Sequence, residues 1–194
     1  QTVKVSAVTS KSALTPGDQF AVAVIFDHAP GWHVHTNKPV VPKGWDFDPI
    51  PTKIIPTTPT GIRVGATQWP PVHEILADLA GLGKPSKYGV FADKAIAFVP
   101  MVVDPSAALG ARTLSFDVTY QACNDKVCNF EQNETLTIAV EVVAPGSSPS
   151  GAAVQPADPS VFADLDLTVF AAIGAGSGVA AASDPARASV KPVE

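Results

Sequence analysis

Residues 114–120, Leu-Ser-Phe-Asp-Val-Thr-Tyr, alternate between apolar and polar side chains. A period of two is typical of a β-strand that buries one face and exposes the other. Residues 136–142, Leu-Thr-Ile-Ala-Val-Glu-Val, also read as a strand. The segment between these runs holds both cysteines of the chain, Cys123 and Cys128. We therefore predict a β-hairpin with the two thiols near its mouth, close enough to bond to each other.

The rest of the chain repeats this strand signal at short intervals. Runs rich in Val, Ile, Ala and Phe occur at residues 3–8, 20–26, 32–35, 53–55, 61–65 and 95–103. Pro and Gly, at 19 and 14 residues, are frequent, and charged residues make up only 16%. Many short strands joined by turns predict an all-β, antiparallel β-sandwich.

Composition excludes several classes of function. The formal net charge is −5, so the chain lacks the basic surface that nucleic-acid binding requires. Hydrophobic residues make up 46%, enough for a buried core. The apolar stretch 167–182 is interrupted by glycines and falls short of a membrane span. The opening residues 1–5 already read as a strand, as expected of a processed, secreted protein.

Two segments depart from the strand pattern. Residues 70–88 contain three prolines and two glycines and predict a long irregular loop, of the kind that forms lids or binding loops. After residue 144 the composition shifts to Ala, Pro, Gly and Ser, which predicts one folded domain over 1–144 and a linker or tail over 145–194. One helix is expected over Ser160–Ala172, with Ser160 as its cap and Asp164 in its first turn.

The close spacing of the cysteines favours chemistry over reinforcement. A disulfide closing a loop of about six residues contributes only about 2 kcal/mol of chain entropy. A reversible dithiol/disulfide couple uses this spacing better. Two alternatives remain open. One is a secreted binding module with an inert hairpin disulfide, and the other is a Cu(I) or Zn(II) site formed by both cysteines with His33 and His35.

Other polar residues are candidates for supporting that chemistry. His33 and His35 alternate on one strand, so their side chains share a face and could stabilise a thiolate or shuttle a proton. Surface-strand histidines are the alternative. His73 and Glu74, in the irregular loop, could approach the thiols as acid/base groups, or could be ordinary loop residues. Between the cysteines, Asn124-Asp125-Lys126 reads equally well as a solvated polar turn.

The run Tyr120-Gln121-Ala122-Cys123, with a second cysteine shortly after it, resembles the amino-terminal periplasmic domain of DsbD-type thiol:disulfide interchange proteins. That group includes the copper-sensitivity suppressor ScsB. Residues 31–37, 65–70, 83–88 and 95–100 resemble further parts of the family pattern. The resemblance covers roughly residues 1–143.

The resemblance implies an immunoglobulin-like sandwich whose hairpin carries the redox pair. A cap loop, here His73 to Phe91, would shield the pair until a partner docks, with Tyr88 and Tyr120 among the supporting residues. Electrons would arrive from a thioredoxin-like domain of the same membrane protein. They would leave to periplasmic disulfide isomerases and to thioredoxins of cytochrome c maturation. Cys128 is implied as the first attacker, and no organic cofactor is expected.

The chain departs from the family pattern at two places. Family members often place an aromatic residue at the cap tip, whereas here the early loop offers only Ile75, Leu76 and Leu79. Since Tyr88 and Phe91 come later, the expected shielding is aliphatic or looser. His33 and His35 stand where well-known members have tyrosines, which leaves copper handling as a variant function.

Overall fold

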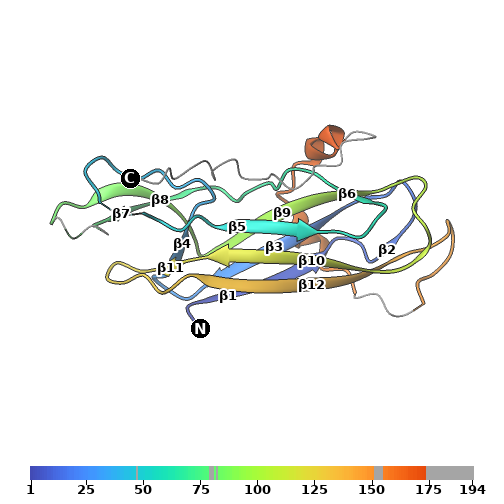
Figure 1. Ribbon diagram of the computed structural model, residues 1–194, viewed down its shortest axis with the longest axis horizontal. Coiled ribbons are helices and arrows are strands. Elements are labelled where there is room, and N and C mark those ends of the chain that lie inside the picture. Colours follow the sequence, from blue (N-terminus) through green and yellow to red (C-terminus); the bar gives the residue numbers. More distant parts are fainter. Residues whose placement is uncertain (47, 79–80, 82, 151–154, 174–194) are drawn as a thin grey trace, which may run out of the picture.

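The computed structural model describes residues 1–46, 48–78, 81, 83–150 and 155–173. In that part of the chain, three four-stranded sheets build an elongated molecule (Figure 1). Every strand pair among the described residues is antiparallel except the short contact between β2 and β12. Two sheets pack face to face, and the third lies at one end of them (Figure 1). The predicted antiparallel, immunoglobulin-like β-sandwich is confirmed.

The three sheets draw their strands from distant parts of the chain. The first sheet has, in spatial order, β1 (Val3–Thr9), β3 (Gln19–His28), β9 (Lys94–Val103) and β6 (Ile62–Val64). The second has β2 (Ala13–Leu14), β12 (Gln132–Val142), β10 (Gly110–Tyr120) and β5 (Lys53–Thr57). The third has β11 (Ala122–Cys123), β4 (His33–His35), β8 (Ser86–Ala92) and β7 (His73–Ala77).

The alternation along β10 decides which of its faces is buried. Leu114, Phe116 and Val118 are buried in the main core between the first two sheets. Strand β12 pairs with β10 over its whole length, from Gly110 opposite Val142 to Tyr120 opposite Gln132. Each large apolar side chain buried here contributes about 1.5–3 kcal/mol of transfer free energy. The register thus holds Tyr120, and the cysteine segment after it, at one end of the sandwich.

Strands β3 and β9 are buried on both faces, which explains their nearly continuous apolar sequences. One face of β3, including Val22 and Val24, lies in the main core. The other face carries Ala21 and Ala23, which pack against residues from the carboxyl-terminal segment 155–173. Phe170 and Ile173 of that segment are themselves buried. This part of the predicted tail therefore covers the outer face of the first sheet.

The single helix expected over Ser160–Ala172 is wrong. Two short 3-10 helices stand there instead, η1 (Pro159–Phe162) and η2 (Leu167–Ala172). The side chains of Asp158 and Asp166 accept hydrogen bonds from the backbone N–H groups two residues on, so each aspartate caps its own helix. Capping at Asp166 starts a second helix where the prediction had one helix continue. The remainder of the predicted tail, 151–154 and 174–194, lies outside the described residues.

The irregular loop expected over 70–88 is also wrong. Its residues contribute β7 and the start of β8, which pair antiparallel with Glu74 opposite Gly89 and Ile75 opposite Tyr88. Strand β8 pairs in turn with β4. The strand signal in His73–Ala77 is only five residues long and is flanked by prolines and glycines. These residues form a strand because they pair with β8, which itself pairs with β4. Tertiary context therefore decides their conformation.

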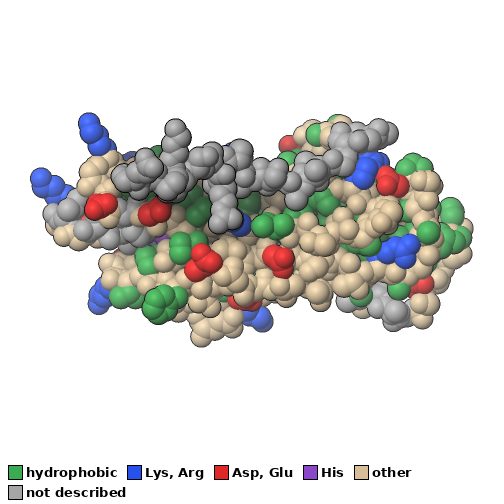
Figure 2. Space-filling model, in the orientation of Figure 1, with side chains coloured by type: hydrophobic (Ala, Val, Ile, Leu, Met, Phe, Trp, Pro, Cys, Tyr) green, Lys and Arg blue, Asp and Glu red, His purple; other side chains and the backbone are tan. Residues whose placement is uncertain are grey.

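Charged side chains are sparse on the surface of the molecule (Figure 2). On the face shown in Figure 2, acidic and basic side chains lie scattered and do not gather into a basic patch (Figure 2). This agrees with the net charge of −5. No helix among the described residues has the length and apolar character needed to cross a bilayer.

Candidate functional site

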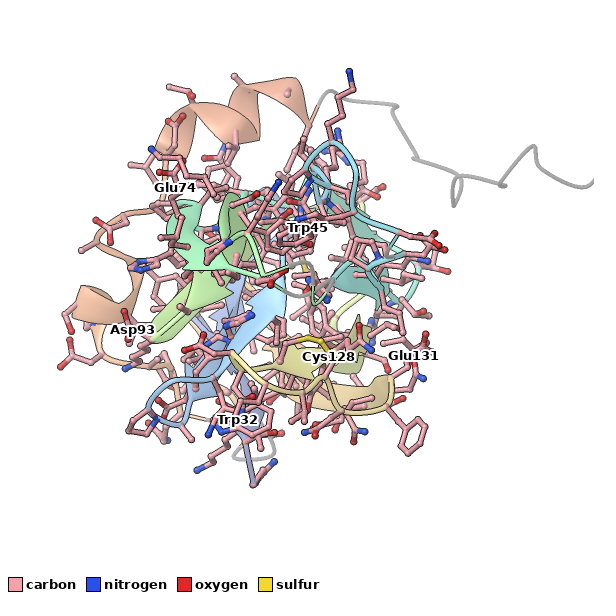
Figure 3. The ribbon with its side chains drawn as sticks, turned by 90° about the vertical axis from the view of Figure 1, so that its left-hand side faces the viewer. Trp32, Trp45, Glu74, Asp93, Cys128 and Glu131 are labelled. Atoms are coloured by element: carbon pink, nitrogen blue, oxygen red, sulfur yellow. A yellow bond between two sulfur atoms is a disulfide. The ribbon has the colours of Figure 1, made fainter. Side chains whose placement is uncertain are left out.

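The cysteines lie in the third sheet, at one end of the molecule. Strand β10 ends at Tyr120, and after one residue the chain enters β11, which pairs with β4 so that Cys123 stands opposite His33. Cys128 then returns beside Cys123 as its antiparallel bridge partner. Figure 3 views the molecule from this end, and Cys128 and the yellow disulfide bond are visible there. The structure confirms that both cysteines lie in the segment that connects the two strands of the predicted hairpin, β10 and β12.

The turn between the cysteines is organised by one asparagine. The Asn124 side-chain oxygen accepts hydrogen bonds from the backbone N–H groups of Lys126 and Val127, both at 2.9 Å. Asn129 N–H donates to the Ala122 carbonyl at 2.8 Å and closes the hairpin. Side-chain capping of this kind is what asparagine does in tight turns. The turn holds Cys123 and Cys128 with their Cα atoms 4.0 Å apart.

The two cysteines form a disulfide, and its two sulfurs differ in environment. Cys123 is 0% exposed and belongs to the buried side of the third sheet. Cys128 is half-buried and lines a surface cleft of about 530 Å³. An incoming thiolate must reach a sulfur along the S–S axis. The environment therefore makes Cys128 the accessible sulfur and Cys123 the protected one.

His35 touches the protected sulfur. Its Nε2 lies 3.4 Å from Cys123 Sγ and 3.2 Å from the side-chain oxygen of Gln121, while its Nδ1 lies 2.9 Å from the Tyr88 hydroxyl. The ring is 0% exposed. Burial lowers the pKa of His35 to about 4, against a smaller raising effect of the Gln121 hydrogen bond. His35 is therefore neutral at pH 7.

His33 is also buried, which excludes the surface-strand alternative for both histidines. Burial lowers the pKa of His33, and the nearby Asp125 carboxylate opposes that shift. Among the described residues, two buried side-chain nitrogen or oxygen atoms have no hydrogen-bond partner. They are His33 Nε2 and His28 Nε2. His28 donates through Nδ1 to the Asp93 carbonyl at 2.7 Å, and burial lowers its pKa as well.

Tyr88 is buried behind His35. Its ring packs against Trp45 with centroids 5.6 Å apart, and burial raises its pKa to about 12. Phe91 is in the main core, where it stacks on Trp69. Neither ring is a loose cap residue, because both belong to β8 inside the sheet. Among the aliphatic residues expected to shield the pair, Ile75 packs in the Trp45 cluster, Leu76 is exposed, and Leu79 lies outside the described residues.

The structure does not bring His73 and Glu74 to the thiols. Both lie on β7, and β8 and β4 stand between β7 and β11, a separation of about 14 Å at the usual spacing of strands. Glu74 instead pairs with Lys87 at 2.7 Å on the exposed edge. In Figure 3, Glu74 lies well away from Cys128 (Figure 3). Hairpin formation, which the irregular loop prediction missed, is what holds these side chains at the outer edge.

Tyr120 borders the cleft beside Cys128. Its hydroxyl donates to Glu134 at 2.5 Å, and its ring meets Phe26 edge-on in the core. Burial, with the Glu134 carboxylate, raises the pKa of Tyr120. Phe130 lines the same cleft and is 92% exposed.

Two residues of the site received no role from the sequence. Gln121 stands inside the quoted Tyr-Gln-Ala-Cys run, and its side chain bridges His35 and the Asn129 carbonyl. Phe130 follows Cys128 by two residues, and an aromatic residue this close to a cysteine was the available signal. A smaller group of donors, His35, Cys123 and Cys128, has its possible metal-ligand atoms within 4.8 Å of one another. His33, part of the predicted metal set, is not in that group.

The family described as "Thiol:disulfide interchange protein DsbD, N-terminal" has a sequence model that matches residues 1–140. The chain belongs to this family. The two cysteines of the chain form the disulfide described above, so the DsbD N-terminal family and the site agree on thiol–disulfide exchange. No curated protein sequence matches the chain.

Two solved structures illustrate the likeness to the DsbD family. The N-terminal periplasmic domain of ScsB from Proteus mirabilis aligns with 20% identity and a TM-score of 0.44, covering 72% of this chain and 47% of that one. The reduced DsbD N-terminal domain of Neisseria meningitidis aligns with 18% identity and a TM-score of 0.40, covering 73% of this chain and 91% of that one. The chain thus spans about half the length of the ScsB domain.

Proposed function

We propose that this domain passes reducing equivalents from a thioredoxin-like donor to periplasmic partner proteins through the reversible Cys123–Cys128 disulfide. The observation that carries the proposal is the asymmetry of the disulfide, with Cys128 beside an open cleft and Cys123 fully buried. A disulfide with a purely structural role does not need an accessible sulfur. An exchange couple needs one sulfur to receive the attack and another to leave.

The reaction has two balanced steps. A donor thiolate attacks Cys128 Sγ, a new S–S bond forms between them, and Cys123 leaves with the electron pair as a thiolate. The donor's second thiolate then attacks the donor sulfur of the mixed disulfide and releases Cys128. The donor ends as a disulfide and this domain as a dithiol, which takes up the two protons. The reverse sequence, begun by Cys128, would reduce a partner's disulfide.

Family membership supports the cellular setting of the proposal. We infer a periplasmic domain that is part of a larger membrane protein, with a thioredoxin-like domain as donor. Disulfide isomerases and thioredoxins of cytochrome c maturation are the proposed acceptors. The oxidising compartment of the periplasm suits a protein that must deliver electrons there.

The reduction potential of the Cys123–Cys128 couple tests the proposal. Equilibration with glutathione or dithiothreitol buffers, followed by alkylation and mass measurement, should give a value between about −270 and −120 mV, the range of exchange proteins. A value below about −300 mV is that of a structural disulfide. It would overturn the relay and leave the binding module with an inert disulfide as the better reading.

Phe130 is proposed as the docking residue for the donor. An exposed aromatic beside the reactive sulfur is the kind of side chain that dominates binding energy once a partner covers it. Phe130→Ala should raise the KM for a thioredoxin-like donor about five- to thirtyfold, with little change in kcat. Steady-state reduction assays would measure both constants.

Leu109→Ala is the matched control for Phe130. Leu109 is 57% exposed and precedes Gly110, the start of β10, whereas the cysteine segment follows the other end of that strand. An 11-residue strand spans about 34 Å, so Leu109 is remote from the cleft. Equal KM values for Phe130→Ala and Leu109→Ala would show that the donor docks elsewhere.

A further inference from the structure

We propose that His35 is a catalytic residue of the exchange reaction, as a neutral hydrogen-bond donor that stabilises the departing Cys123 sulfur. The inference rests on the proposed exchange function and deepens it. It adds Gln121 and Tyr88 as positioning residues that hold the proton of His35 on the nitrogen facing the sulfur.

The orientation of Gln121 is fixed by the backbone. Its side-chain nitrogen lies 3.0 Å from the Asn129 carbonyl oxygen, which can only accept a hydrogen bond. The amide nitrogen must therefore point at Asn129. The amide oxygen of Gln121 then points at His35, 3.2 Å from its Nε2.

The orientation of Gln121 decides the tautomer of His35. The Gln121 oxygen has no proton to give, so a hydrogen bond with it requires the proton on Nε2. A neutral imidazole has only one N–H, and Nδ1 is then an acceptor. The Tyr88 hydroxyl, 2.9 Å away and held protonated by burial, donates to that Nδ1. All three hydrogen bonds agree on the same tautomer.

The Nε2–H of His35 is therefore the group that meets the sulfur. Nε2 lies 3.4 Å from Cys123 Sγ, which is a normal N–H···S distance. The same nitrogen lies 3.2 Å from the side-chain oxygen of Gln121, so its one N–H faces both acceptors. When an external thiolate attacks Cys128, the S–S bond breaks and its electron pair stays on Cys123. A thiolate is a far stronger acceptor than a disulfide sulfur, because hydrogen bonds to charged groups are about twice as strong. The existing N–H then stabilises the leaving group more than the starting disulfide, and so lowers the barrier.

Burial makes this donor necessary. Both Cys123 and His35 are 0% exposed, so water cannot solvate the charge that develops on the sulfur. A buried thiolate without a donor is strongly disfavoured. The same tautomer argues against His35 as a metal ligand or as a base toward Cys123, because the nitrogen lone pair needed for either role carries a proton.

Two variants of His35 separate its hydrogen bond from its packing. His35→Gln keeps an N–H donor at about the reach of Nε2, whereas His35→Leu keeps a side chain of similar bulk with no donor. The rate of disulfide reduction by dithiothreitol at pH 7 should fall about tenfold in His35→Leu and stay within about threefold of the parent in His35→Gln. His73→Leu, the same change at the outer edge of the sheet, should leave the rate unchanged. Equal slowing in the Gln and Leu variants would overturn the proposal.

A second measurement needs no variant. The ¹⁵N shifts of the His35 ring in the oxidised protein should show neutral imidazole with its proton on Nε2. A proton on Nδ1 would overturn the proposal and would favour the metal site formed by His35 with the two reduced cysteines.

Reduction by dithiothreitol needs no protein partner, so the test is independent of the relay. A potential in the exchange range with equal rates for the two His35 variants would remove only the role of His35. A structural potential below about −300 mV would remove the exchange function itself.

Discussion

Cys123→Ser should capture a thioredoxin-like partner as a stable mixed disulfide, and Cys128→Ser should capture far less. Cys123→Ser leaves the accessible sulfur of Cys128 free to react and removes the sulfur that would resolve the complex. Cys128→Ser leaves only Cys123, which is 0% exposed. Net exchange should be abolished in both variants, because a disulfide cannot form with one cysteine.

A kinetic form of this experiment measures the difference in reactivity between Cys128 and Cys123. The partner is a thioredoxin-like protein with its second active-site cysteine replaced and the first activated as a mixed disulfide with thionitrobenzoate. Release of the coloured thiolate should be at least about tenfold faster with Cys123→Ser than with Cys128→Ser, following the access of each sulfur. Both variants lose the same six-residue loop, so they are matched in the stability that the disulfide provided.

The double variant, Cys123→Ser with Cys128→Ser, is the background for this comparison. Equal rates from the two single variants would contradict the assignment of Cys128 as the entry sulfur. Failure of both to react would count against the relay itself.

Acid should destabilise the oxidised domain as the pH falls from about 6.5 toward 4. Burial lowers the pKa of His35 from 6.5 to about 4, and burial also lowers the pKa values of His28 and His33. Between pH 6.5 and about 4 the unfolded chain therefore binds protons that the folded chain does not. The stability is complete above about pH 6.5 and is lost as the pH falls toward 4.

The expected loss from His35 alone is about 2–3 kcal/mol between pH 7 and pH 4.5, and the other two histidines add to it. Urea unfolding at the two pH values measures the difference directly. In thermal unfolding, 1 kcal/mol corresponds to roughly 2–4 °C for a chain of this size, so the midpoint should fall by at least about 5 °C.

His35→Gln provides the control for the acid effect. The variant replaces the titrating ring with a neutral amide, so its stability should depend less steeply on pH than that of the parent. An unchanged free energy of unfolding from pH 7 to pH 4.5 in the parent would mean that the buried histidines take up protons without unfolding the site.

The prolines and glycines of residues 70–88 led the sequence prediction to an irregular loop, and the structure has β7 and the start of β8 there. Local pattern could not reveal these strands, because their hydrogen-bond partners are β8 and β4. The same hairpin carries Tyr88 to His35 and keeps His73 away from the cysteines. Missing the hairpin is why the prediction placed His73 and Glu74 near the thiols.

The carboxyl-terminal segment illustrates a second limit of local pattern. Its Ala- and Pro-rich composition reads as a linker, yet Phe170 and Ile173 bury themselves against β3 and β9. The Gln68 side chain holds it by donating to the Asp164 carbonyl and accepting from Asp166 N–H, both at 2.9 Å. The sequence did contain a sign of this contact, since β3 and β9 are apolar on both faces and require a cover on each.

The sequence by itself determined the β-sandwich, the hairpin with its two cysteines, and the family to which the chain belongs. Each of these follows from neighbours along the chain: a period of two, a turn, and a short motif around Cys123. Only the tertiary structure decided that Cys128 is accessible and Cys123 buried, and that His35, 88 residues earlier, lies 3.4 Å from the buried sulfur. Exposure and long-range contact depend on the pairing of β11 with β4 and β4 with β8. That pairing is set by the packing of the whole fold, which no local stretch of sequence encodes.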